Sequence, residues 1–136
     1  MTVFVCIDDR GGMTFNSRRQ SRDMLVTEDI LNHAGDHPLY VTDFSEDLFE
    51  NTDAQLISVP APLSSARSDA FIFIENLPLL PDLDKIKNLV IYRWNRVYPH
   101  DTILDINPKK EGFTLTRVTE FAGKSHEKIT KEIYTR

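Results

Sequence analysis

The chain has 136 residues, a formal net charge of −5 at neutral pH, and a composition that is 40% hydrophobic and 27% charged. This length predicts a single domain, spanning residues 1–136, with a substantial hydrophobic core. An acidic chain lacks the cations that non-specific nucleic-acid binding requires, and a single cysteine, Cys6, excludes an intramolecular disulfide and a cysteine-based metal site. No leader-like N-terminus and no apolar run of membrane-spanning length occur, so we expect a cytoplasmic protein without membrane or nucleic-acid partners.

The N-terminal part of the chain predicts a buried strand followed by a helix. Residues 3–7 are β-branched and aromatic, and acidic and glycine residues follow them directly. From residue 23 to residue 34 the apolar period becomes helical, with Asp23 placed to cap the first turn and Gly35 placed to end the helix. The predicted apolar stripe of this helix consists of Met24, Thr27, Leu31 and Ala34, with Ile30 beside it.

The rest of the chain predicts further short strands and a terminal hairpin. Strands are expected at 39–41, 55–59, 70–74 and 89–94, with one helical turn at 45–49 capped by Ser45, a turn or broken helix at 77–83 and a long connection at 97–112. Residues 113–121 and 128–135 alternate in polarity around a turn at 122–125, which indicates an antiparallel hairpin. The predicted fold class is therefore α/β, a single-domain mixed sheet flanked by few helices with a C-terminal antiparallel hairpin.

The loop after the first strand is rich in positive charge although the chain is acidic, because it carries Arg10, Arg18, Arg19 and Arg22. Guanidinium groups bind carboxylates and phosphates in a bidentate manner, and a helix N-terminus adds partial positive charge. The loop thus predicts an anion site with ligand-binding residues Asn16, Arg18, Arg19, Arg22 and Asp23, helped by the hydroxyl of Ser21. The alternative is a solvated network in which the arginines pair with the nearby acids Asp8, Asp9, Asp23 and Glu28.

Other polar residues carry weaker signals. Glu28 and Asp29 on the predicted helix have two interpretations. One of them is a general acid or base that faces a pocket, or both belong to a solvated helix face. The four histidines have no metal-ligand spacing, so we expect surface histidines and no metal site. These histidines are His33, His37, His100 and His126.

The order of these elements resembles that of the dihydrofolate reductases. The resemblance rests on the strand, acidic–glycine turn and asparagine loop of residues 3–16, on Glu28-Asp29-Ile30-Leu31, on the strand at 87–95, and on the terminal hairpin with its closing Ile-Tyr-Thr-Arg. It implies a trimmed reductase-like fold. It also implies that the family's catalytic carboxylate corresponds to Glu28, with Asp23 and Asp29 as alternative registers.

Three departures from the family pattern concern the site itself. Arg18-Arg19-Gln20-Ser21 stands where the family has a Pro-Trp pair, and Thr42-Asp43-Phe44-Ser45 stands where it has a Gly-Arg-Lys-Thr segment. Glu75-Asn76 replaces the diglycine that lets the cofactor pyrophosphate approach the backbone, and a carboxylate there repels a pyrophosphate. We therefore predict no cofactor.

Three functions remain open from the sequence. The first, which we favour, is a non-reductase protein, a pseudoenzyme on a reductase-like scaffold, that binds a small anionic metabolite or nucleotide through the arginine loop. The second is a divergent reductase that uses NADPH in an altered mode. The third is a protein–protein interaction or assembly module, for which a homodimer is one form.

Overall fold

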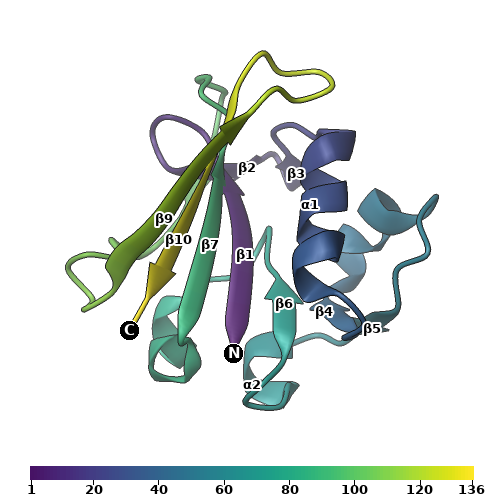
Figure 1. The fold of residues 1–136 in the computed structure, drawn as a ribbon, viewed down its shortest axis with the longest axis vertical. Helices are drawn as coiled ribbons and strands as arrows, with labels where there is room; N and C mark the ends of the chain where they lie inside the picture. The colour runs from purple at the N-terminus through teal and green to yellow at the C-terminus, as the bar shows by residue number, and fades with distance from the viewer.

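A computed structural model describes all of residues 1–136, and its centre is a mixed sheet of seven strands in the order β5-β4-β6-β1-β7-β10-β9 (Figure 1). The first five strands in this order run parallel, and β10 is antiparallel to both β7 and β9. The predicted α/β sheet with a terminal antiparallel hairpin is thus confirmed. The strands are β1 (Thr2–Ile7), β4 (Leu39–Val41), β5 (Leu56–Ser58), β6 (Phe71–Phe73), β7 (Asn88–Arg93), β9 (Thr114–Phe121) and β10 (Ile129–Thr135).

The main helix, α1 (Met24–Ala34), begins and ends where the sequence predicts. The Asp23 side chain accepts the Leu25 N–H, and Gly35 has a φ of 63° while its N–H donates to the Leu31 carbonyl. The predicted apolar stripe is wrong in part, because Met24 is 57% exposed. The face that packs on the sheet consists of Val26, Thr27, Ile30 and Ala34.

Three shorter helices complete the helical content: η1 (Asp43–Phe49), α2 (Pro62–Ser65) and η2 (Leu80–Lys85). The predicted turn at 45–49 is longer than expected, and Ser45 does not cap it, because its hydroxyl donates to Glu75 instead. Non-helical backbone angles at Asp82 interrupt η2, in agreement with the predicted broken helix.

A second, small sheet was not predicted. It has the order β3-β2-β8 and is antiparallel, with β2 (Gly12–Phe15), β3 (Arg18–Arg19) and β8 (Thr102–Ile103). Strands of two to four residues are too short to show a two-residue period, so the sequence presents them as loops. The predicted connection at 97–112 therefore contains one of these strands.

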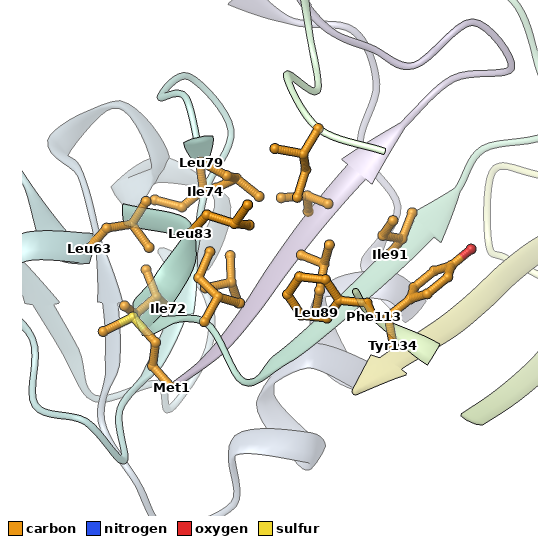
Figure 2. Packing of buried hydrophobic residues seen from close by; sticks show 14 of the residues in the cluster. Met1, Leu63, Ile72, Ile74, Leu79, Leu83, Leu89, Ile91, Phe113 and Tyr134 are labelled. Atoms are coloured by element: carbon orange, nitrogen blue, oxygen red, sulfur yellow. The ribbon is translucent and has the colours of Figure 1, made fainter. Parts of the chain in front are cut away.

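The core lies on both faces of the seven-stranded sheet. β1 shows why, since Val3, Val5 and Ile7 point to one face and Phe4 points to the other. Figure 2 shows the first face, where side chains of β6 and β7 meet those of α2, η2 and the segment before β9. Helix α1 covers the second face, and Ile30 packs there with Phe4. No helix of the structure is long and apolar enough to span a bilayer.

Three loops meet at the end of the sheet where the parallel strands β1 and β7 terminate, which is the upper end in Figure 1. We call this end the carboxyl edge of the sheet. The chain leaves β1 into the β2–β3 hairpin, leaves β7 into residues 94–101, and turns from β9 into β10 through residues 122–128. Hydrogen bonds connect these segments, for example from the Gln20 side chain to the Pro99 carbonyl and from the Lys124 N–H to Asp23. This edge is where polar side chains from distant parts of the chain meet.

Shortening Ile30 tests the packing of α1 on the sheet. Ile30→Ala removes a fully buried side chain, so we expect a loss of about 2–5 kcal/mol in the free energy of unfolding, measured by urea denaturation. Met24→Ala on the exposed face of the same helix is the control, with an expected change within about 0.5 kcal/mol. Equal losses in the two variants would contradict the observed orientation of α1.

Candidate functional site

Asp8, at the end of β1, organises the first turn of the site. Its buried carboxylate accepts the N–H groups of Arg10, Gly12 and Tyr98 and the side-chain amide of Gln20. Burial by itself raises the pKa of the Asp8 carboxyl, but these hydrogen bonds outweigh it and hold the pKa below its ordinary value. Asp8 is therefore ionised and holds the turn together, and it forms no ion pair with the side chains of the loop arginines.

Arg19, on β3, forms an ion cluster with two carboxylates from other elements. Its Nε and Nη2 atoms donate to the two carboxylate oxygens of Glu75, each at 2.8 Å. Its Nη1 and Nη2 atoms donate to Asp47 of η1 at 3.0 and 2.9 Å. Ser45 adds a hydroxyl donor to Glu75 at 2.7 Å, and the Arg19 guanidinium lies over the Phe44 ring. The hydrogen bond from Arg19 is also the main reason why the pKa of Asp47 is lowered.

This cluster bears on the two interpretations of the arginine loop, an anion site or a network with the neighbouring acids. Arg19 is paired, but with acids 28 and 56 residues away and with none of the neighbouring acids. Arg10, Arg18 and Arg22 form no side-chain hydrogen bond or ion pair. The predicted local network is therefore wrong, while an anion site at the unpaired arginines stays a prediction.

His126, expected at the surface, is buried and only 4% exposed. Its Nδ1 lies 2.9 Å from Asp23 Oδ2, and its Nε2 lies 2.9 Å from Ser21 Oγ and 3.2 Å from Tyr98 Oη. The imidazole stacks on Trp94 with ring centroids 4.7 Å apart and planes 23° apart. The expectation fails because the turn between β9 and β10 folds back over the loop before α1, which encloses the ring.

Asp23 receives five hydrogen bonds, which makes it the most densely bonded carboxylate of this edge. The donors are the N–H groups of Leu25, Lys124 and Ser125, the Ser125 hydroxyl and the His126 imidazole. Burial raises the pKa of Asp23, yet these bonds, the Lys124 N–H first, lower it well below its ordinary value. Asp23 is thus ionised and fully engaged within the protein.

The predicted site residues lie in three different places. Asn16, Arg18 and Arg19 line one open depression of about 460 Å3, together with Gln20 and Tyr98. Arg22 and Asp23 border a separate cavity of only about 10 Å3, beside Ser21 and Glu75. Glu28 is exposed on the far side of α1, in a groove of about 600 Å3 formed with residues 51–55.

The groove beside Glu28 is acidic and polar. Asp36 and Asp53 line it with Glu28, and His37 is its only basic side chain. Asp29, the alternative register, accepts hydrogen bonds from Tyr92 and Lys131 instead of lining the groove. No set of three or more histidine, cysteine or acidic side chains has an arrangement that holds a metal ion.

The sequence alone does not predict the buried group around His126. Ser21 and His126 are 105 residues apart, and neither carries a local motif that signals their contact. The only available signal is the position of residues 122–125 in a hairpin turn whose strands return to the same edge. That signal places the turn at this edge but does not say which side chain points inward.

The fold of the chain is that of the dihydrofolate reductases. No protein-family model matches the sequence, and no curated protein matches it. Among solved structures, the chain is similar to dihydrofolate reductase from Enterococcus faecalis, complexed with NADP(H) and RAB-propyl, with a TM-score of 0.70. The match covers 99% of this chain and 95% of that chain at 7% sequence identity, so the likeness is one of fold.

Replacing each of two adjacent arginines tests the ion cluster. Arg19→Ala leaves the nearly buried Glu75 carboxylate without its cation, so we expect a loss of about 3–5 kcal/mol in unfolding free energy by urea denaturation. Arg18→Ala, one residue earlier and unpaired, is the control and changes stability by less than about 0.5 kcal/mol. Equal stability of the two variants would show that the cluster contributes nothing.

The hydrogen bonds of Asp23 predict a pH dependence of stability. A lowered pKa in the folded protein means that the carboxylate stabilises the fold above its unfolded value of 3.8 and loses this effect as the pH falls below it. Asp23→Asn should cost about 1–3 kcal/mol at pH 7 and show a smaller further loss between pH 4 and pH 2 than the natural protein. Urea unfolding at each pH measures this, with exposed Asp36→Asn as the control; parallel pH profiles for all three proteins would refute it.

Proposed function

We propose that this chain is a binding protein on a dihydrofolate reductase-like fold, which holds a small anionic metabolite or nucleotide and does not use a nicotinamide cofactor. The observation that carries the proposal is the unpaired guanidinium of Arg18 at the open depression beside β3. In a chain of net charge −5, an arginine without a carboxylate partner is available to an external anion.

The neighbours of Arg18 supply further donors. Asn16 lines the same depression and forms its tight turn at a positive φ of 53°, and its side-chain amide has no partner within the protein, whereas the Gln20 amide already donates to Asp8 and Pro99. Arg22, on the same loop, is exposed and also lacks a partner. Guanidinium forks and neutral donors of this kind suit a phosphate or a carboxylate.

The Arg19 cluster supports the absence of nicotinamide chemistry. Glu75 follows β6, at the position where the resemblance to the reductases puts a diglycine, and Asp47 lies on the helix beside it. One guanidinium and two carboxylates together carry a net negative charge. A pyrophosphate brought to this position would meet like charge in a partly buried setting, which is unfavourable.

An assembly role has one observation in its favour. β9 is the edge strand of the seven-stranded sheet, and its Val118 is 52% exposed. An eight-residue edge with unpaired backbone groups is a place where a second chain can add a strand. This makes a β9-mediated dimer the second candidate.

Thermal-shift measurements with inorganic phosphate, ATP, NADPH and folic acid separate these functions. We expect phosphate or ATP to raise the melting temperature in a saturable way, since a ligand at about 100 times its Kd adds roughly 2.7 kcal/mol. Arg18→Ala should abolish the shift, whereas Arg67→Ala, an exposed arginine outside the loop, should retain it.

Two results would redirect the assignment. Stabilisation by NADPH that survives Arg18→Ala would favour the divergent reductase. No shift with any of the four compounds, together with a concentration-dependent dimer on gel filtration that Val118→Lys abolishes, would favour the assembly role.

A further inference from the structure

Ser21, His126 and Asp23 form a continuous hydrogen-bonded array at the carboxyl edge of the sheet. Ser21 Oγ lies 2.9 Å from His126 Nε2, and His126 Nδ1 lies 2.9 Å from Asp23 Oδ2. A hydroxyl, an imidazole and a carboxylate in this order are the groups that activate a serine for nucleophilic attack. The array joins the loop before α1 to the β9–β10 turn.

The surroundings of His126 assign its tautomer. Asp23 is ionised, so it requires a donor at Nδ1, and the Nδ1–H donates to it. In the neutral imidazole Nε2 is then an acceptor, and it faces the Ser21 hydroxyl and, at 3.2 Å, the Tyr98 hydroxyl. The stacked Trp94 ring restricts rotation of the imidazole and keeps this orientation.

Groups that can stabilise a developing oxyanion lie next to Ser21. The backbone N–H groups of Ser21 and Arg22 donate to no acceptor within the protein. The phenol of Tyr98 donates to Ser21 Oγ at 3.4 Å, and Arg22 lines a small cavity together with Ser21. Free N–H groups at the nucleophile are the usual donors to the oxyanion of an acyl-transfer intermediate.

Solvent reaches the array only at Ser21, the end at which a nucleophile must meet its substrate. Ser21 is partly exposed, whereas His126 and Asp23 are nearly inaccessible. The cavity that Ser21 borders has a volume of about 10 Å3, roughly the space of one water molecule. The space beside Ser21 is thus very limited, which favours the smallest acyl groups over longer chains.

We propose that Ser21 is the nucleophile of an esterase activity toward esters of small acyl groups, the acetyl class. Ser21 Oγ bonds to the carbonyl carbon while its proton moves to His126 Nε2, and the ester C–O bond breaks as that proton passes to the leaving alcohol. Water then attacks the acetyl-Ser21 carbonyl and gives a proton to Nε2. The bond between the acyl carbon and Ser21 Oγ then breaks, Oγ takes the proton back from Nε2, and acetic acid leaves and ionises in solution. Asp23 acts as a positioning residue for His126. The inference stands independently of the anion site.

Acetylation by p-nitrophenyl acetate, followed by mass spectrometry of the peptide that contains Ser21, is the first test. We expect acetyl-Ser21 to form and p-nitrophenol to be released, and Ser21→Ala to remove both. His126→Gln should lower the rate by about a hundredfold or more, and p-nitrophenyl butyrate should react at least about tenfold more slowly. Ser65→Ala, an exposed serine on α2, is the matched control and should react as the natural protein does.

A thiol at the same position separates an activating role of His126 from a purely structural one. In Ser21→Cys, an imidazole-activated thiol should react with iodoacetamide at neutral pH about tenfold faster or more than an ordinary thiol. Burial raises the pKa of Cys6, the natural thiol, which leaves it a slow internal reference. Adding His126→Gln or Asp23→Asn should remove the enhancement in protein that remains folded by circular dichroism.

The proposal is overturned if folded protein forms no acetyl-Ser21. It is equally overturned if the introduced thiol reacts at an ordinary rate whether or not His126 is present. In either case the array is a structural connection between the β9–β10 turn and α1. Failure of phosphate or ATP to bind bears on the anion site alone.

Discussion

The candidate site of this protein depends on the carboxylate of Asp23. It caps α1 and at the same time accepts hydrogen bonds from the turn between β9 and β10, so one side chain joins the main helix to the terminal hairpin. The approach is so close that a Cβ at Gly123 would lie 2.5 Å from an Asp23 oxygen. Only glycine permits this contact without a shift, and the contact in turn encloses His126 over Trp94.

Arg19 also joins separate elements of the fold through its side-chain hydrogen bonds. It reaches Glu75 and Asp47, and thereby connects β3 with the end of β6 and with η1. The mostly buried guanidinium of Arg19 is stable because its charge is paired and its N–H groups donate to the carboxylates, while the Ser45 hydroxyl adds a donor to Glu75. The same cluster places negative charge at the position where the reductase-like pattern has a diglycine, and this charge supports our proposal that the protein does not use a nicotinamide cofactor.

How far the sequence predicts the structure depends on whether the signal is local. Asp23 and Gly35 delimit α1 correctly because capping is decided by a few neighbouring residues. The terminal hairpin was predicted because its long strands alternate in polarity. The small β2–β3–β8 sheet was missed because its strands are too short for any period. Met24 was misassigned to the buried stripe, since the sheet determines which helix face it covers.

Local patterns along the chain are enough to predict the α/β class, the limits of α1, the terminal hairpin and the positive charge of the arginine loop. The pairing of Arg19 but not of the other loop arginines, and the burial of His126 beside Ser21 and Asp23, depend instead on how the chain folds in space. The physical reason is that ion pairs and hydrogen bonds join groups within about 3 Å of one another in space. The chain separation of these partners, up to 105 residues, leaves no trace in the local pattern.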